Sequence, residues 1–271
     1  MTNIILIQGG GDLASGIAYR LHKAGLKVLI SELPQPLSVR RKVSFCEAIY
    51  DGEITIEGIT GRLIRPEEIS DTLKKEKIPV LIDPDLDILQ IPIPNSKISV
   101  LIDATLRKHA RVGLVDVPLN IGLGPGFTAP ENCHAVIETN RGHSLGRIYW
   151  EGSAMADTGI PEQVLGIRSE RVLRAPANGK LVAHGDIGDH FDKDEIICEV
   201  DGIPLYAPFN GSLRGLIRPG LSVKKGLKIG DLDPRDDPRY STMISDKALA
   251  LGGSVLEAIL SQKEIRDGLW S

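Results

Sequence analysis

The residues best suited to chemistry in this chain of 271 residues are three glycines near its start. Gly9, Gly10 and Gly11 follow a short apolar run and precede a segment whose apolar residues recur at helical spacing. The order Gly9-x-Gly11-x-x-Ala14 fits the fingerprint in which a glycine turn and a helix N-terminus hold a dinucleotide pyrophosphate. Glu32 ends the next apolar run, about 20 residues further on, where an acid bonds a ribose hydroxyl. These four residues form the predicted nucleotide-binding set.

The same turn also has a purely structural interpretation. Asp12 stands beside the start of the predicted helix, where its carboxylate can cap the N–H groups that a phosphate would use. A tight turn that only packs the helix on the sheet explains the glycines equally well. The sequence leaves both interpretations open.

Carboxylates end two later apolar runs, at Asp83 and Asp103. In a parallel sheet both would lie at the carboxyl edge, where such sheets bind ligands. Asp83, Asp85 and Asp87 alternate in a way that suits Mg²⁺, but capping of the next turn is the favoured interpretation, so no metal site is predicted. Lys108 follows Asp103 closely and is a candidate partner for an anionic ligand, although a solvated helix face also explains it.

A second glycine-rich loop places Gly122, Gly124 and Gly126 around one proline. Their backbone N–H groups are a candidate anion nest in the same crevice, and the loop lacks the Lys-Ser/Thr ending of a P-loop. Cys133 is the only candidate nucleophile, and its neighbour His134 would point to the opposite face of an extended strand. A buried structural thiol is the favoured interpretation, so the catalytic residues stay unknown.

The elements that must position these residues alternate between strand and helix. An apolar run at 4–7, a helical face at 13–21 and a second run at 27–30 predict a βαβ unit. Residues 135–150 predict a hairpin that closes the domain. We therefore expect an α/β fold in which residues 1–150 form a Rossmann-like domain with a parallel sheet.

The second half contains an internal repeat. The segment 175–181 recurs 32 residues later at 207–213, and the register holds without a gap to Asp233. Two copies of one strand–turn–strand unit that cannot bury its own face should pack together. This part, residues 171–234, resembles the lipoyl/biotinyl barrel-sandwich hybrid, an all-β hammerhead. The hairpin at 199–204 has no lysine, so we expect no covalent lipoyl or biotin.

The remaining segments connect or follow these domains. Residues 151–170 carry scattered Gly and Pro and predict a linker. Residues 235–271 predict a C-terminal helical segment, with one helix at 246–263 that contains Gly252-Gly253 and packs on a neighbouring domain.

Composition excludes several classes of protein. Lys plus Arg is 32 and Asp plus Glu is 36, so a net charge of −4 argues against nucleic acid as the main partner. Three cysteines far apart, Cys46, Cys133 and Cys198, exclude a disulfide framework and a CxxC-type zinc site. No signal peptide or apolar run of about 20 residues is present, so we expect a cytoplasmic protein without a membrane segment.

The order of the motifs resembles one known family. The motifs are IQGGGDLASG at 7–16, RRxVSF at 40–45, GLGPGFTA at 122–129, CHAVIET at 133–139, RVLRAP at 171–176 and ISDKA at 244–248. Together they resemble the selenium-dependent molybdenum hydroxylase system proteins of the YqeB type. The resemblance implies an accessory or maturation factor, with a hydroxylase subunit or other maturation factors as partners and a nucleotide or molybdopterin-type cofactor as ligand. It assigns no reaction and no catalytic residue.

Two other functions stay open. The glycine fingerprint also suits an NAD(P)-dependent oxidoreductase, although no Tyr-x-x-x-Lys pair accompanies it. A non-catalytic scaffold or docking protein is the second alternative, in which the glycine loops are only turns. Whether the protein is an enzyme is therefore left open.

Overall fold

The computed structural model describes residues 2–106, 113–157, 159 and 163–269. Contacts divide the chain into two compact units that are discontinuous in sequence. Unit 1 comprises residues 1–36, 45–157 and 244–271, and unit 2 comprises residues 37–44 and 158–243.

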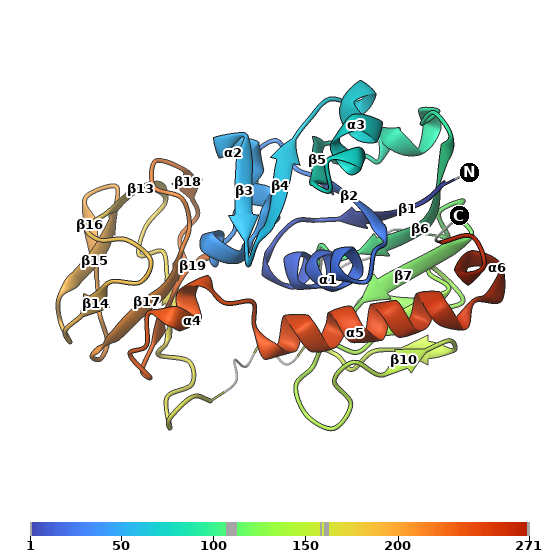
Figure 1. Cartoon of the computed structure of the whole chain (residues 1–271). Helices are drawn as coiled ribbons and strands as arrows, with labels where there is room; N and C mark the ends of the chain where they lie inside the picture. The colour runs from blue at the N-terminus through green and yellow to red at the C-terminus, as the bar shows by residue number, and fades with distance from the viewer. Residues whose placement is uncertain (1, 107–112, 158, 160–162, 270–271) are drawn as a thin grey trace. The chain divides into compact units, whose positions relative to one another are not determined.

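Unit 1 is built on a nine-stranded mixed sheet with the order β10-β9-β7-β6-β1-β2-β5-β4-β3 (Figure 1). The strands from β9 to β4 in this order pair in parallel, and the edge strands β10 and β3 pair antiparallel with their neighbours. The strands are β1 (Thr2–Gln8), β2 (Lys27–Glu32), β3 (Glu53–Ile56), β4 (Ile59–Leu63), β5 (Ile78–Ile82), β6 (Ser96–Asp103), β7 (Leu119–Leu123), β9 (Ala135–Ile137) and β10 (Ile148–Tyr149). A separate pair consists of β8 (Thr128–Ala129) and β11 (Gly152–Ser153).

The central strands are apolar because both of their faces are covered. Ile4, Ile5, Leu6 and Ile7 of β1 have no exposed surface. One face packs on a cluster that includes residues of α3 and of the segment 86–93. A strand buried on both faces needs a continuous apolar run rather than alternation, as the sequence has here.

The helices of unit 1 are α1 (Asp12–Lys23), α2 (Ala48–Asp51), α3 (Ile69–Lys74), α5 (Asp246–Ser261) and α6 (Lys263–Arg266), with 3-10 turns η2 (Phe45–Glu47), η3 (Pro66–Glu68) and η4 (Asp87–Gln90). Helix α5 lies along α1 (Figure 1). The two approach closely because Gly16 has no side chain: a Cβ there would lie 2.5 Å from the Cβ of Ala248. Among the described residues, no helix has the length and apolarity that crossing a membrane requires.

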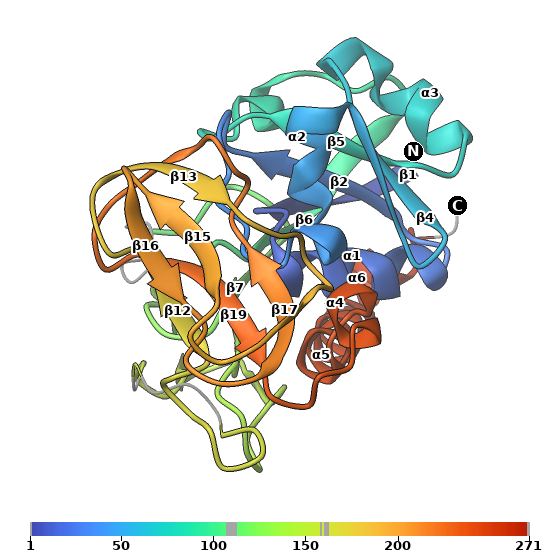
Figure 2. The ribbon, with the colours of Figure 1, turned by 90° about the vertical axis from the view of Figure 1, so that its left-hand side faces the viewer.

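Unit 2 consists of two four-stranded antiparallel sheets, β12-β19-β17-β14 and β16-β15-β13-β18 (Figure 2). The strands are β12 (Val172–Arg174), β13 (Gly179–Ala183), β14 (His190–Phe191), β15 (Ile196–Val200), β16 (Ile203–Tyr206), β17 (Gly211–Leu216), β18 (Ser222–Val223) and β19 (Lys228–Asp233). The 32-residue repeat relates the two sheets strand by strand: β12 corresponds to β16, β13 to β17, β14 to β18 and β15 to β19. Each sheet therefore contains strands from both copies of the repeat.

The segment 37–44 belongs to unit 2 because two arginines attach it there. The guanidinium of Arg40 donates to the carbonyls of Tyr240 and Met243, beside α4 (Arg239–Thr242), at 2.8 and 2.7 Å. Arg41, in η1 (Arg41–Val43), donates to the carbonyl of Leu216 at 2.7 Å. The RRxVSF motif thus has a structural role in this unit.

The predicted fold class was wrong. We expected a parallel Rossmann-like domain followed by a barrel-sandwich hybrid and a C-terminal helix, whereas the chain has a mixed α/β structure in which unit 1 is built around a nine-stranded mixed sheet. The sheet is mixed because both edge strands pair antiparallel: β10 with β9, in the hairpin expected at 135–150, and β3 with β4, in a hairpin at 53–63 whose turn, Glu57-Gly58, has positive φ at both residues. Apolar and polar residues alternate within 53–63, a pattern that predicts a β-hairpin.

The contact units also differ from the continuous boundaries that we expected, which ended the first domain at residue 150. Residues 244–271 carry α5 and α6 and belong to unit 1, while residues 37–44 leave it. A composition shift along the chain does not show such exchanges, because they depend on contacts between distant segments.

Candidate functional site

The candidate site lies at the carboxyl edge of the sheet in unit 1. From β1 the chain continues to β2 and β5 on one side, then returns to β6 and β7 on the other side. At this reversal of strand order, the loops that follow β1 and β6 lead away from each other and leave a crevice between them. Open α/β sheets bind ligands in such a crevice. Strand β1 ends there at Gln8, immediately before the glycine turn.

The first two glycines of the turn are fixed by their surroundings. Gly9 has a φ of +94°, and its N–H donates to the carbonyl of Ser31 at 2.8 Å. The carbonyl of Gly10 accepts bonds from the N–H of Cys46 at 2.9 Å and from the hydroxyl of Ser15 at 3.0 Å. A Cβ on Gly10 would lie 2.9 Å from the nitrogen of Cys46. Both glycines are therefore required by the fold.

Gly11 is different, because neither its backbone nor its packing requires a glycine. Its φ is −71°, and a Cβ there would meet no atom within 4 Å. It is the N-cap of α1, a position usually held by a residue whose side chain bonds the first-turn N–H groups. A glycine provides no such side-chain acceptor, and Asp12 places a carboxylate in the first turn of this 12-residue helix.

Glu32 is buried and bonded to the glycine turn. Its side-chain Oε1 accepts the N–H of Gly10 at 2.7 Å, and its Oε2 accepts the N–H of Leu33. Burial raises the pKa of this carboxyl above its ordinary value, and the two backbone hydrogen bonds oppose that shift. Since a carboxylate has about four acceptor positions, it can still accept hydroxyl donors from a ligand.

The raised pKa of Glu32 gives a testable pH dependence. Folding favours the protonated acid, so its stabilising contribution is complete below the unfolded-state pKa and is lost as the pH rises through the folded-state pKa. Glu32→Gln removes this titration, so the variant should gain stability relative to wild type as the pH rises from 4 to 7.5. Urea unfolding across this range measures the difference. The same change at the exposed Glu67 is the control, and equal pH profiles for wild type and Glu32→Gln would contradict the prediction.

The sequence analysis missed two polar residues at the same edge. Gln8 and Ser31 are register partners in β1 and β2, so their side chains project from the same face. Both are buried, and Gln8 Oε1 and Ser31 Oγ have no hydrogen-bond partner in the described part of the chain. The sequence held one sign of them: each is a polar residue at the end of a buried apolar run. Unpaired buried acceptors are costly, which suits a place where a ligand or water completes the bonding.

Asp103 is also a register partner of Gln8, so the sheet brings it beside the glycine turn. One of its carboxylate oxygens accepts from the N–H and the hydroxyl of Thr105, at 3.1 and 2.6 Å. The N–H of Ala104 donates to the carbonyl of Gln8 at 2.9 Å. Asp103 therefore lies in the crevice, where it turns the chain that leaves β6.

Asp83 lies at the same edge after β5, but it acts as a cap. Its two carboxylate oxygens accept the N–H groups of Asp87 and Ile88 at the start of η4. Among the described residues, no three His, Cys, Asp or Glu side chains gather in a group that could hold a metal ion. The favoured interpretation of this acidic run as a cap is confirmed by these bonds.

Packing and turn geometry account for the second glycine loop. A Cβ on Gly122 would lie 2.1 Å from the ring of Phe127. The N–H of Gly124 donates to the carbonyl of Ile137, and the carbonyl of Gly126 accepts from the side chain of Asn132. Gly122 pairs with Asp103 on the neighbouring strand, so it borders the crevice. The N–H of Gly124 is therefore already used within the fold, and an anion nest in this loop stays a prediction.

The surroundings of Cys133 are those of a buried structural thiol. It has no exposed surface, and burial raises its pKa to about 11 despite a hydrogen bond from the backbone of Gly122. The Nδ1 of His134 accepts the N–H of Asn120 at 2.9 Å, which binds this side chain to β7. A thiol with this pKa has little thiolate at neutral pH, so the geometry gives no support to Cys133 as a nucleophile.

We expect none of the three cysteines to react in the native protein. Cys46 and Cys198 have no exposed surface either, and burial raises the pKa of Cys198 to about 11. A disulfide reagent at pH 7.5 should titrate no thiol before unfolding and all three in guanidinium chloride. One thiol that reacts within seconds under native conditions would contradict this account.

Lys108, with its neighbours from 107 to 112, lies outside the described residues. Its predicted role toward an anionic ligand stays a prediction. The structure thus brings together Gly9, Gly10, Gly11, Glu32 and Asp103, adds Gln8 and Ser31, and places Gly122 at the border.

One curated protein is similar to this chain over most of its length. Over 259 residues the chain is 42% identical to a protein of Escherichia coli (strain K12) named "Uncharacterized protein YqeB". The chain is a relative of YqeB. The alignment covers 95% of the chain and 47% of the relative, so the chain spans about half the length of the curated relative it matches. This supports the YqeB part of the resemblance and does not extend to a role in selenium or molybdenum chemistry.

Other comparisons add little. No protein-family model matches the chain. Two solved structures have a partial likeness: an aspartoacylase family protein from Mesorhizobium loti MAFF303099, 9% identical with a TM-score of 0.27, and a succinylglutamate desuccinylase from Silicibacter sp. TM1040, 10% identical with a TM-score of 0.25. Each match covers 85–86% of this chain and 84–85% of the other. Scores this low do not indicate a common fold.

Proposed function

We propose that unit 1 binds a nucleotide-type ligand at the carboxyl edge of its sheet. Phosphate groups would lie against Gly11 and the start of α1, and ribose hydroxyls would donate to the carboxylate of Glu32. The observation that carries the proposal is the open space at Gly11, next to a buried carboxylate bonded to the turn. A glycine that neither packing nor backbone geometry requires is expected where a ligand must approach the backbone.

The charges of the crevice favour phosphates at the start of α1 and the sugar beside the carboxylates. Glu32 and Asp103 are buried acceptors that suit hydroxyl donors and repel phosphate. The end of α1 is the part of the crevice that attracts an anion. The phosphates therefore belong at Gly11, and the sugar belongs toward β2 and β6.

Thermal unfolding against a ligand panel tests the proposal. The panel contains NAD, NADP, ATP, GTP and CTP, each with and without Mg²⁺, and a molybdopterin cofactor preparation. A ligand that binds only the native state adds about 2.7 kcal/mol of stability at 100 times its Kd. A shift with NAD or NADP alone would favour an oxidoreductase. A panel without any shift would contradict nucleotide binding and favour the scaffold function.

We further propose that this binding serves an accessory role in the maturation of a selenium-dependent molybdenum hydroxylase, with a hydroxylase subunit as partner. Support for this role comes only from the motif resemblance. Deletion of the gene in an organism that makes such a hydroxylase should lower its activity without lowering the amount of its polypeptide. Wild type should restore the activity, and Gly11→Leu should not. Undiminished hydroxylase activity in the deletion strain would contradict the role.

A further inference from the structure

A cavity lies at the amino ends of β1 and β6, at the edge of the sheet opposite to the glycine turn. Its volume is about 390 Å³, within the size range of small-molecule sites. Asn3 and Ser99 contribute its polar interior, Pro118 and Ile265 contribute apolar walls, and Lys97 and Lys263 also line it. All of these residues belong to unit 1.

The interior of this cavity holds two polar side chains without partners. Asn3 is 4% exposed and Ser99 is 2% exposed. Asn3 Oδ1 and Ser99 Oγ make no hydrogen bond in the part of the chain that the structure describes. An unsatisfied buried polar atom destabilises a fold, so two of them in one cavity indicate that something binds there.

The backbone is shaped to bring these side chains to the cavity. Ile4 pairs with Ile98 but Ile5 pairs with Val100, so Ser99 is the extra residue of a bulge in β6. Bulges re-aim a side chain and occur often beside functional sites. Gly268 leaves room for Asn3, because a Cβ at 268 would lie 2.5 Å from the Asn3 Nδ2.

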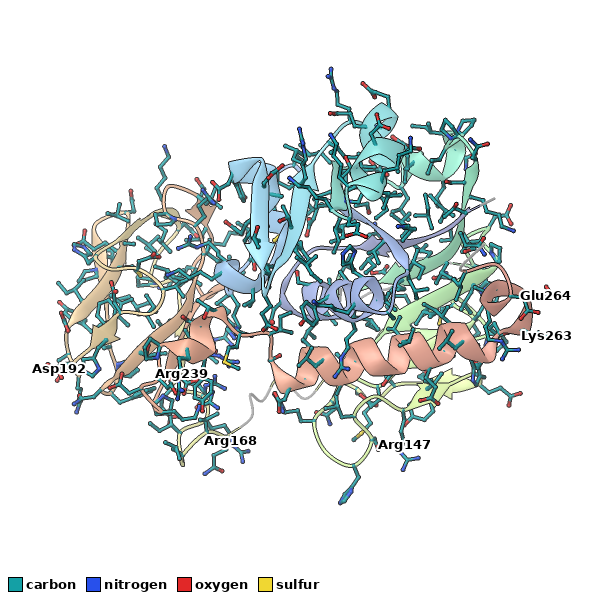
Figure 3. The ribbon with its side chains drawn as sticks, in the orientation of Figure 1. Arg147, Arg168, Asp192, Arg239, Lys263 and Glu264 are labelled. Atoms are coloured by element: carbon teal, nitrogen blue, oxygen red, sulfur yellow. The ribbon has the colours of Figure 1, made fainter. Side chains whose placement is uncertain are left out.

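The rim is charged. Lys97, Lys263 and Glu264 are exposed, and no ion pair joins them to another described residue. Lys263 and Glu264 lie on α6 and extend from the surface of the helix (Figure 3). Two ammonium groups and one carboxylate leave the rim with one net positive charge, which suits a monoanion.

We propose that this cavity binds a small monocarboxylate with hydroxyl groups along its chain, of the size of a sugar acid. The carboxylate meets Lys97 and Lys263, and the hydroxyl groups donate to Asn3 Oδ1 and bond to Ser99 Oγ. The carbon chain contacts Pro118 and Ile265. Its hydroxyl groups complete both unsatisfied side chains, which an apolar molecule or an anion without hydroxyl groups would not do.

Two matched probes test the proposal by isothermal titration. D-gluconate carries a carboxylate and hydroxyl groups, and hexanoate has the same chain length without hydroxyl groups. Gluconate should bind with a Kd near or below about 1 mM and at least about tenfold more tightly than hexanoate, because a site with buried hydrogen-bonding groups rejects the analogue that lacks them.

Two variants remove the partners one at a time. Asn3→Leu and Ser99→Ala should each weaken gluconate binding about tenfold or more while raising the melting temperature of the free protein, since each removes an unsatisfied buried atom. Gly11→Leu, at the other edge of the sheet, should bind gluconate as wild type does. Equal affinity for gluconate and hexanoate, no binding of gluconate, or unchanged binding in Ser99→Ala would overturn the proposal and leave ordered water as the occupant.

Discussion

Gly11→Leu is expected to fold and to lose nucleotide binding by at least about 100-fold. A side chain at this position extends into open space, so the cost in stability should be about 1 kcal/mol, that of a poor N-cap residue. The same side chain would occupy the place where a phosphate approaches the first turn of α1. Equilibrium unfolding in urea measures the stability, and titration with the nucleotide that stabilises wild type measures the binding.

Gly10→Ala is the contrasting variant. Its Cβ would lie 2.9 Å from the nitrogen of Cys46, in a turn that the fold closes with several hydrogen bonds. Overpacking of this kind costs about 1–3 kcal/mol, so this variant should lose mainly stability. If a folded Gly11→Leu protein bound the nucleotide as tightly as wild type, Gly11 would not be part of the site.

The second large effect concerns the contact between α1 and α5. Gly16→Ala should destabilise the protein by about 1–3 kcal/mol, because its Cβ would lie 2.5 Å from that of Ala248 and 2.9 Å from its backbone carbon. The gain of about 1 kcal/mol that alanine has over glycine in a helix interior offsets only part of this cost. Denaturant unfolding of the variant and wild type gives the difference.

Gly253 in α5 provides the matched control. A Cβ there meets no atom within 4 Å, so Gly253→Ala should stabilise the protein by about 0.5–1 kcal/mol. The same change from glycine to alanine should thus lower the free energy of unfolding in α1 and raise it in α5. Similar stabilisation by both changes would show that α1 and α5 are not in close contact.

Most single elements of unit 1 could be predicted from the sequence, and their assembly could not. The apolar run at 4–7, the helical face at 13–21 and the helix at 246–263 correspond to β1, α1 and α5. The antiparallel pair β9–β10 was expected from residues 135–150, but the parallel class was wrong because the hairpin β3–β4 within residues 53–63 was not predicted. This hairpin is short, and its antiparallel pairing at the edge makes the sheet mixed rather than parallel.

The part of the candidate site formed by the glycine turn and Glu32 was predictable from the sequence. The glycine turn and Glu32 were expected at one edge, and the bond from Gly10 to Glu32 brings them together. Asp83 showed that a carboxylate after a strand can serve equally as a cap. Gln8 and Ser31 were missed because their importance depends on which atoms stay unpaired after folding.

The most direct measurement of the central claim is amide hydrogen exchange of the wild-type protein with and without a saturating nucleotide that stabilises it. The amides from Gly11 to Ala14 should exchange more slowly in the complex, because the phosphates accept their hydrogens, and this protection should be absent in Gly11→Leu. Unchanged exchange at these amides, with protection only elsewhere in the chain, would contradict a nucleotide site at the carboxyl edge of the sheet.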